Sequence, residues 1–526
     1  MMRLLLVFGL ALAFVCGSAG APAAFPTPEA ERATSLLWIR DGHLTRAGAE
    51  LVGELNLVEK RGLRAADYGI QGLQQLAKAL DTSGVLTAAT LARFDAELST
   101  AAAWLASDLH LGRVSPAEVG YDLDIRRPGF DVRQAVESLA ASPDVAAALD
   151  ALEPQLHHYT LLKQSLARYR ELAETVDLGQ LPAIPRRSVR PGEAYAGAGA
   201  LRRLLTAFGD LREPVEPAIA DSPDLDPALV AALTRFQSRH GLDEDGVLGR
   251  ATYRALTTPM ATRIQQIELS LERVRWLPPW HDSPPIIVNI PQFRLFAFRT
   301  GRDFEQDMLQ MDVIVGADFK GRHTPVFAAD MRFIVVQPYW DVPRSILVKE
   351  LLPDILSDPQ WIDKNGYEIV RGQSDDAQPL PVTDQSVQLL ARGTLRLRQK
   401  PGPKNALGHV KFMFPNRHNV YLHDTPAREL FSRSRRAFSH GCIRVSDPMA
   451  LLAHVMRDDP TWNEARRDEA LASPGPVRVP LPRPIRVFIL YGTALASEAG
   501  ETLFFDDIYA QDAPLAARLA ARRSKQ

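Results

Sequence analysis

The chain contains one stretch that decides how the rest is interpreted, Phe438-Ser439-His440-Gly441-Cys442-Ile443-Arg444. Cys442 is one of only two cysteines, and the other, Cys16, lies in an N-terminal segment typical of a removable export signal. The mature chain would therefore carry a single thiol with no internal disulfide partner. An unpaired cysteine is usually a small buried apolar side chain. Here the neighbouring residues favour a reactive thiol instead.

A strand pattern precedes this stretch at Asn419-Val420-Tyr421-Leu422-His423. Alternation places Tyr421 and His423 on the same face of the strand. Gly441 has no Cβ, so it allows a sharp turn that brings backbone N–H groups close to a reacting carbonyl. A cysteine beside a histidine is a common nucleophile, because the thiolate is the reactive form and an imidazolium stabilises it. These residues predict a Cys–His catalytic site.

Two segments together resemble the signature of the L,D-transpeptidases, a family of bacterial enzymes that cross-link the cell wall. They are His423-Asp424-Thr425-Pro426 and Ser439-His440-Gly441-Cys442-Ile443-Arg444. Two histidines, a glycine, a cysteine and a following arginine at this spacing form a long and specific motif. The resemblance implies that the chain is a cysteine acyltransferase acting on peptidoglycan.

The resemblance also implies a role for each catalytic residue. Cys442 would attack the carbonyl between diaminopimelate, the third residue of a donor tetrapeptide stem, and D-Ala. His423 would take the thiol proton and later deprotonate the acceptor amine. The backbone carbonyl of Asp424 would orient the imidazole, without any need for its carboxylate. Backbone N–H groups around Gly441 and Cys442 would stabilise the oxyanion.

Four residues are expected to bind substrate. Arg444 can hold a carboxylate through its fork of donors. Tyr421 would line the groove on the face of His423, and His440 and Ser439 complete the predicted set. No cofactor and no metal are implied. Carbapenems are expected to acylate Cys442, because a strained lactam carbonyl is an acyl donor like the stem peptide.

Length and composition predict a multidomain α+β protein. The 526 residues suggest two to four domains, and 46% hydrophobic with 24% charged residues is a globular composition. A net charge of −2 gives no support for nucleic-acid binding. The predicted parts are a signal peptide (1–24), a helical scaffold domain (25–195), a peptidoglycan-binding domain (196–259), a connecting helix (260–283), a catalytic domain (284–510) and a C-terminal tail (511–526).

The first residues have the features of a secretory signal. Arg3 is followed by the apolar run Leu4 to Val15 and by small residues up to Ala21, although Ala23 or Ala24 also suits cleavage. The run is too short for a comfortable membrane span. The expected location is the periplasm, with membrane anchoring if the segment stays uncleaved.

Helical periodicity dominates from about Phe25 to Arg187, and Leu181 to Pro191 form a Pro/Arg-rich linker in which regular structure is not expected. The helical part resembles the helical scaffold domain of large Gram-negative L,D-transpeptidases. Residues 196–259 resemble a three-helix peptidoglycan-binding domain, with Asp226 as a cap and Pro227 opening its second helix. Both resemblances imply that the partners are peptidoglycan stem peptides and glycan polymer, and they admit other cell-wall synthesis enzymes.

Strand patterns begin at Ile286 and continue through the catalytic domain. They break between residues 343 and 407, where no strand pattern is apparent. The apolar content of this segment favours an inserted subdomain over a structureless loop. The family resemblance implies a capping subdomain over the active-site groove. The tail is expected to form an Ala/Arg-rich helix or to fray.

Three other functions remain open from the sequence. A hydrolase could use the same thioacyl intermediate with water as the acceptor. A zinc peptidase could use His423, His440 and Cys442, although no HExxH-like helix or separate catalytic glutamate accompanies them. A non-enzymatic wall-binding protein would keep the binding module but would not need Cys442.

Overall fold

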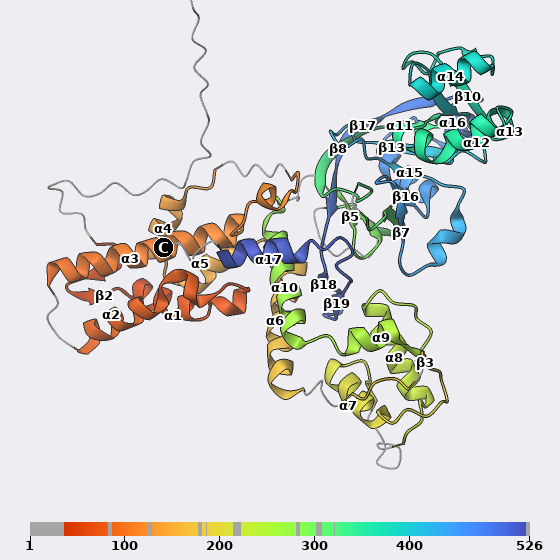
Figure 1. The fold of residues 1–526 in the computed structure, drawn as a ribbon. Helices are drawn as coiled ribbons and strands as arrows, with labels where there is room; N and C mark the ends of the chain where they lie inside the picture. Colours follow the sequence, from red (N-terminus) through yellow and green to blue (C-terminus); the bar gives the residue numbers. More distant parts are fainter. Residues whose placement is uncertain are drawn as a thin grey trace, which may run out of the picture.

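A computed structural model describes residues 36–82, 87–123, 129–176, 181–185, 187–213, 222–279, 284–300, 308–319 and 321–521. The signal predicted at residues 1–24 lies outside them. Figure 1 shows three parts: a helical domain, a small helical module, and a β-rich domain that carries a subdomain at its far end. The predicted fold class, helical parts followed by a β-rich domain, is confirmed.

The N-terminal helical domain packs around buried aromatic side chains. Trp38, Tyr68 and Phe94 are almost fully buried, and the Trp38 N–H donates to Asp95 at 2.7 Å. The Thr45 side chain caps its first helix by accepting from the Gly48 N–H at 3.0 Å. The elements are β1 (Ile39–Arg40), β2 (His43–Leu44), α1 (Arg46–Asn56), α2 (Ile70–Thr82), α3 (Ala88–Leu111), α4 (Val132–Ala141) and α5 (Val145–Leu152).

Two long helices, α6 (His157–Thr175) and α10 (Met260–Arg275), pack together at the centre of the molecule (Figure 1). Arg275 is fully buried between them. Its guanidinium donates to the Tyr159 hydroxyl at 3.1 and 2.9 Å and pairs with Glu272 at 3.2 Å. A buried charge is tolerated only when it is paired and hydrogen-bonded. This network therefore fixes how the two helices cross.

The small module has the three helices that the sequence predicted. The Asp226 carboxylate caps the second one by accepting from the Ala228 and Leu229 N–H groups at 2.9 and 3.0 Å. Arg239 forms a two-point ion pair with Asp210 at 2.7 and 2.6 Å. The elements are β3 (Ser188–Val189), α7 (Ala198–Phe208), α8 (Pro227–Arg239), β4 (Leu248–Gly249) and α9 (Arg250–Leu256).

The β-rich domain is a mixed barrel. Its sheet runs β15-β7-β16-β14-β13-β8-β17-β5-β6, and an additional β7–β6 pairing closes it. The β14–β16, β17–β5 and β15–β7 pairs are parallel. The strands are β5 (Ile286–Asn289), β6 (Arg294–Ala297), β7 (Leu309–Gly316), β8 (Phe327–Val336), β13 (Val410–Met413), β14 (Leu422–His423), β15 (Ala437–Ser439), β16 (Ile443–Val445) and β17 (Val477–Leu490).

The inserted subdomain has a sheet that the sequence did not predict. Four strands in the order β11-β10-β12-β9 lie beside short helices. In β12 the side chain of Arg398 is only 2% exposed and pairs with Glu368 at 2.5 Å. A buried arginine in a strand hides the usual apolar alternation. The elements are β9 (Trp340–Asp341), α11 (Arg344–Ile346), the π-helical turn η5 (Leu347–Leu351), α12 (Leu352–Ser357), α13 (Trp361–Lys364), β10 (Tyr367–Val370), β11 (Pro379–Leu380), α14 (Asp384–Arg392) and β12 (Arg396–Gln399).

The chain after β16 returns to the helical part of the molecule. Two helices, α15 (Pro448–Met456) and α16 (Glu464–Leu471), precede β17, and the hairpin β18 (Ala494–Ala496) and β19 (Thr502–Phe504) follows it. The last helix is α17 (Asp512–Ala521), one of the two outcomes that the sequence left open for the tail. Arg273 of α10 pairs with Asp512 at 2.7 Å, and Arg64 donates to the Leu519 carbonyl at 2.8 Å.

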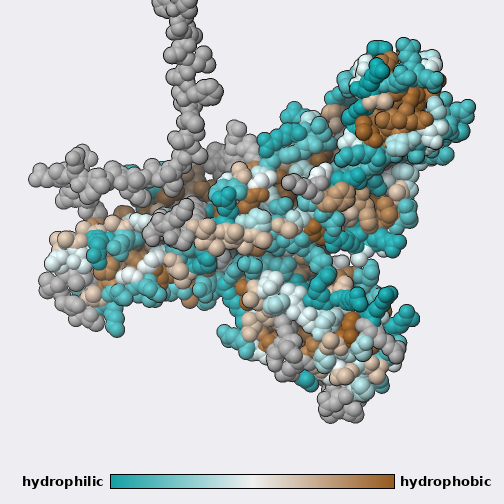
Figure 2. Space-filling model, viewed as in Figure 1, coloured by the Kyte–Doolittle hydropathy of each residue, from teal (hydrophilic) through white to brown (hydrophobic). Residues whose placement is uncertain are grey.

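The surface in Figure 2 is largely hydrophilic, with apolar side chains gathered at the outer end of the inserted subdomain. Exposed Val348 and Leu356 belong to this subdomain. No helix within the described residues is both long and apolar enough to cross a membrane.

Candidate active site

His423 lies in β14, between Lys411 of β13 and Arg444 of β16. It is 4% exposed, and its Nδ1 lies 2.5 Å from the backbone oxygen of Asp424. A carbonyl oxygen only accepts, so Nδ1 carries the hydrogen and Nε2 keeps the lone pair. The Asp424 carboxylate accepts instead from the His409 and Thr425 N–H groups at 2.8 and 2.7 Å. The contact that orients the ring is therefore the expected one, with the backbone of Asp424.

Cys442 lies in a turn between β15 and β16. Gly441, just before it, has φ 121°, a conformation that other residues rarely adopt. The Cys442 Sγ lies 3.8 Å from the backbone oxygen of Asn419. Asn419 has φ 54° and belongs to a turn, so the strand predicted from residue 419 is shorter and β14 begins at Leu422.

Ser439 braces this turn and does not face substrate. Its hydroxyl donates to the Cys442 carbonyl at 2.5 Å and accepts from the Gly441 N–H at 3.0 Å, and the residue is 3% exposed. The substrate-binding role predicted for Ser439 is therefore corrected to a positioning role. The Gly441 N–H is already occupied, which leaves the Cys442 N–H as the candidate oxyanion donor of the two.

Thr324 supports the same turn from the other side, a role that the sequence did not reveal. Its hydroxyl donates to the Gly441 carbonyl at 2.9 Å and accepts from the Gly316 N–H at 2.8 Å. The Tyr509 hydroxyl donates to the Gly316 carbonyl at 2.5 Å. In the sequence, Thr324-Pro325 looks only like a turn. Nothing in that pattern could have connected it with a residue more than a hundred positions away.

Tyr421 and Arg444 complete the group around the thiol. The ring centroids of Tyr421 and His423 are 5.7 Å apart, so both lie on the face that alternation predicted. Cys442 immediately precedes β16 and Arg444 is the second residue of that strand, and Cys442 and Arg444 are close enough for the charge of each to affect the pKa of the other. The structure thus brings together four of the predicted residues: Cys442, His423, Tyr421 and Arg444.

Desolvation disfavours the charged form of both Cys442 and His423. Desolvation lowers the pKa of His423 to about 3, and the charges of Arg444 and Lys411 act in the same direction. Desolvation raises the pKa of the Cys442 thiol, against opposing effects of hydrogen bonds from Tyr421 and the charges of Lys411 and Arg444. Desolvation therefore works against the thiolate–imidazolium pair expected from the sequence and favours a thiol beside a neutral imidazole.

His440 faces the inserted subdomain. Its Nε2 lies 2.7 Å from Oε1 of Glu350 in η5, and Arg322 donates to the same oxygen at 2.5 Å. Desolvation would raise the pKa of Glu350, but the hydrogen bonds from His440 and Arg322 lower it. His440 thus links the nucleophile turn to the inserted subdomain through Glu350. This contact gives it a structural role, separate from the proton transfer between Cys442 and His423.

Lys411 is a residue of the site that the sequence analysis missed. Its Nζ lies 4.1 Å from the ring centroid of Tyr421, and its strand neighbour is His423. Desolvation lowers the pKa of Lys411, although the charges of Cys442 and Asp375 oppose this. The sequence did contain a feature that could have pointed to Lys411. It is the one charged residue in the apolar strand Val410–Met413, where a charge is unusual.

The residues considered for a zinc site are not arranged as a ligand set. His440 is engaged by Glu350, and the Nδ1 of His423 by a carbonyl oxygen. Across the part of the chain that the structure describes, no group of three or more His, Cys, Asp or Glu side chains could hold a metal ion.

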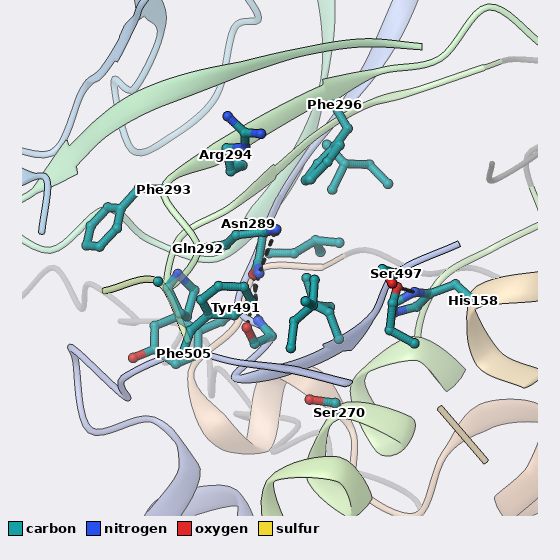
Figure 3. A pocket seen from close by; sticks show the side chains of 18 of the residues that line it. His158, Ser270, Asn289, Gln292, Phe293, Arg294, Phe296, Tyr491, Ser497 and Phe505 are labelled. Atoms are coloured by element: carbon teal, nitrogen blue, oxygen red, sulfur yellow. Dashed lines mark hydrogen bonds between the residues drawn. The ribbon is translucent and has the colours of Figure 1, made fainter. Parts of the chain in front are cut away.

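A cavity of about 900 Å³ lies where the barrel meets the small module and α10 (Figure 3). Asn289 lies in its wall and exchanges two hydrogen bonds with the backbone of Gly492, at 2.7 and 3.0 Å. Arg239 and Gly241 contribute the side of the module. Neither Cys442 nor His423 lines this cavity, so its size does not identify it as the reaction site.

Comparison with known proteins identifies the domains. Residues 284–468 match the model of the L,D-transpeptidase catalytic domain. Residues 196–256 match the model described as a putative peptidoglycan binding domain, and residues 30–166 match the scaffold domain. The chain therefore contains these three domains, and the resemblance inferred from the sequence is confirmed.

A protein of Haemophilus influenzae described as a putative L,D-transpeptidase is 34% identical over 248 residues, which are 47% of this chain and 48% of that protein. The chain thus spans about half the length of this curated relative. Crystal structures of L,D-transpeptidases from Stackebrandtia nassauensis (14% identity, TM-score 0.24, 59% of this chain and 97% of that one) and Xylanimonas cellulosilytica (15%, 0.17, 59% and 100%) also align. At these TM-scores they add nothing to the assignment.

Proposed function

We propose that the protein is a peptidoglycan L,D-transpeptidase that works through a thioester on Cys442. The observation that carries the proposal is the pairing of β14 with β16, which sets His423 beside the strand that follows Cys442, with Tyr421 next to both side chains. The Asp424 carbonyl engages Nδ1 of His423 and leaves Nε2 as the base. The catalytic-domain match over residues 284–468 and the relative from Haemophilus influenzae support it.

The first step uses the neutral pair. As the Cys442 sulfur attacks the carbonyl between diaminopimelate and D-Ala, the thiol proton passes to Nε2 of His423. A thiol kept protonated by burial needs such a base, because the free thiolate is too scarce. The Tyr421 hydrogen bonds and the charges of Lys411 and Arg444 stabilise negative charge as it forms on sulfur.

The tetrahedral oxyanion then needs backbone donors. The Cys442 N–H is the candidate, since Ser439 occupies the Gly441 N–H. Removing one such donor typically costs roughly 2.7–4 kcal/mol of transition-state stabilisation. Collapse breaks the C–N bond, His423 gives its proton to the leaving amine, and D-Ala departs from a thioester.

The second step reverses these roles. A neutral acceptor amine attacks the thioester carbonyl, and His423 takes its proton. The C–S bond breaks, the sulfur recovers the proton, and a new amide joins two stems as a 3-3 type cross-link. Arg444 is placed to hold a substrate carboxylate on the side of His423 that faces β16.

The module at residues 196–256 would hold the enzyme on the glycan polymer without chemistry of its own. A tether raises the effective concentration of stems near the thiol. Export through the signal at residues 1–24 would place the enzyme in the periplasm, where its substrate lies.

Muropeptide products test the proposal. Purified full-length protein is incubated with disaccharide-tetrapeptide, and the products are identified by mass spectrometry. Cross-linked dimers and free D-Ala are expected with the native enzyme, and neither with Cys442→Ala. Tripeptide and D-Ala without dimers would instead show a hydrolase using the same thioester. D-Ala release by folded Cys442→Ala would refute the thiol mechanism.

A further inference from the structure

A row of side chains crosses one face of the barrel sheet beside the thiol. Register pairs Arg478 with Val335, Val335 with Lys411, Lys411 with His423, and His423 with Arg444. Residues paired in register lie on the same face of a sheet, and adjacent strands are about 4.8 Å apart. The catalytic histidine therefore has one cation on each side, Arg444 toward β16 and Lys411 toward β13.

Lys411, the neighbour of His423 in the row, also lines a pocket of about 850 Å³, and Cys442 and His423 lie outside its lining. Its floor is formed by Lys411, Val335 and Arg478 of the row, and one wall is the segment 473–476 after α16. The other wall is the segment 375–379 of the inserted subdomain. Arg398 fixes this wall by donating to the carbonyls of Asp375 and Ala377 at 2.7 and 2.9 Å.

Lys411 forms no salt bridge with any carboxylate among the residues that the structure describes. Its Nζ stacks on the Tyr421 ring at 4.1 Å. The other side chains that share the floor are apolar or cationic. A half-buried ammonium without an anionic partner is unfavourable. An anionic group on a ligand in this pocket would supply the missing partner.

The mouth of the pocket has the opposite charge. Asp375 and Asp376 are exposed at its rim, and the charge of Asp375 reaches Lys411. An approaching ammonium is attracted to this rim, whereas the interior beside Lys411 disfavours a second positive charge. The gradient suits an amine that arrives protonated and must be neutral when it attacks.

We propose that this pocket is the acceptor subsite, and that Lys411 holds a carboxylate on the carbon that bears the attacking amine. The inference rests on the proposed function, because a reaction that joins two stems needs two sites on opposite sides of the nucleophile. Arg444 serves the donor side and Lys411 the acceptor side. The pocket thus selects acceptors of the amino-acid type over simple amines.

The attack itself balances without another reactant. The neutral amine forms a C–N bond to the thioester carbon, its proton passes to His423, and the C–S bond breaks with return of the proton to sulfur. Lys411 does not exchange a proton in this sequence. It is a positioning and specificity residue.

A competition between two acceptors tests the subsite. The acyl-enzyme, formed from a tetrapeptide stem, is offered D-phenylalanine and phenethylamine, which differ by the carboxylate alone. The wild-type enzyme should prefer D-phenylalanine, and Lys411→Met should reduce this preference by about 10- to 100-fold, the usual scale for a hydrogen bond to a charged group. Both acceptors attack the same thioester, so the ratio is insensitive to any change in thiol reactivity.

Two further variants frame the result. Arg478→Met, at the exposed end of the row, should reduce the preference by a smaller factor, and this substitution leaves the buried residues intact. Arg486→Met is the matched control, because Arg486 lies on the same strand, pairs with Asp330 at 3.0 Å and does not line the pocket. Its ratio should equal that of the wild type.

Each outcome decides one hypothesis. A folded Lys411→Met enzyme with an unchanged preference would overturn the subsite and leave the proposed function intact. The same holds for an unchanged Arg478→Met if Lys411→Met does not fold. A wild-type enzyme that releases no D-Ala would overturn the proposed function first, and the subsite with it.

Discussion

Replacing Thr324 by valine should loosen the nucleophile turn and slow acylation of Cys442. Valine keeps the shape of threonine but removes the hydroxyl, which donates to the Gly441 carbonyl and accepts from the Gly316 N–H. Thr324 is 1% exposed, so water cannot replace these bonds. An unsatisfied buried group costs about 1–3 kcal/mol, so the two together should lower the free energy of unfolding by about 2–6 kcal/mol.

The control is Thr324→Ser, which keeps the hydroxyl and loses one buried methyl group at a cost of about 1 kcal/mol. Urea unfolding of both variants, followed by tryptophan fluorescence, measures the difference. The rate of covalent labelling of Cys442 gives the functional readout. A displaced turn should slow labelling at least about tenfold in the valine variant, because small misplacements cost large factors in rate. A valine variant as stable and as reactive as the serine variant would refute the role assigned to Thr324.

Three other predictions follow from the site. A carbapenem should add one drug mass to Cys442, seen by intact-protein mass spectrometry, and an equal adduct on Cys442→Ala would contradict this. His423 stays neutral in the folded state down to about pH 3, whereas an unfolded histidine binds a proton below about pH 6.5. Its contribution to stability is therefore full above pH 6.5 and falls as the pH drops towards 3. His423→Gln should flatten this slope in unfolding measurements, and a slope equal to that of the wild type would contradict the lowered pKa. Deleting residues 196–256 should reduce co-sedimentation with isolated peptidoglycan several-fold, and unchanged binding by a folded deletion variant would show that the wall contact lies elsewhere.

The sequence predicted the parts of the site that are local in the chain. Alternation placed Tyr421 and His423 on one face, and glycine chemistry placed a turn before Cys442. It missed the contacts made by tertiary packing: Thr324 reaches the turn only because β7 and β15 are neighbours in the barrel.

The effect of burial on charged groups was the second feature that could not be predicted from the sequence. An ion pair between Cys442 and His423 is the natural expectation for two such residues in water, and desolvation disfavours it. The sheet of the inserted subdomain escaped prediction for a related reason, since buried Arg398 breaks the apolar pattern that marks a strand. Charges that are stabilised only by distant partners cannot be recognised from spacing.

The segment that follows β17 attaches the barrel domain to α10 and to the small module through three contacts. Arg273 holds Asp512, Gln266 of α10 donates to the Phe505 carbonyl at 3.3 Å, and Arg239 of the small module donates to the Thr502 carbonyl at 3.2 Å. These contacts join the barrel domain, α10 and the small module to one another. If the module holds the glycan polymer as proposed, its fixed attachment to the barrel domain would limit which stem peptides can reach Cys442.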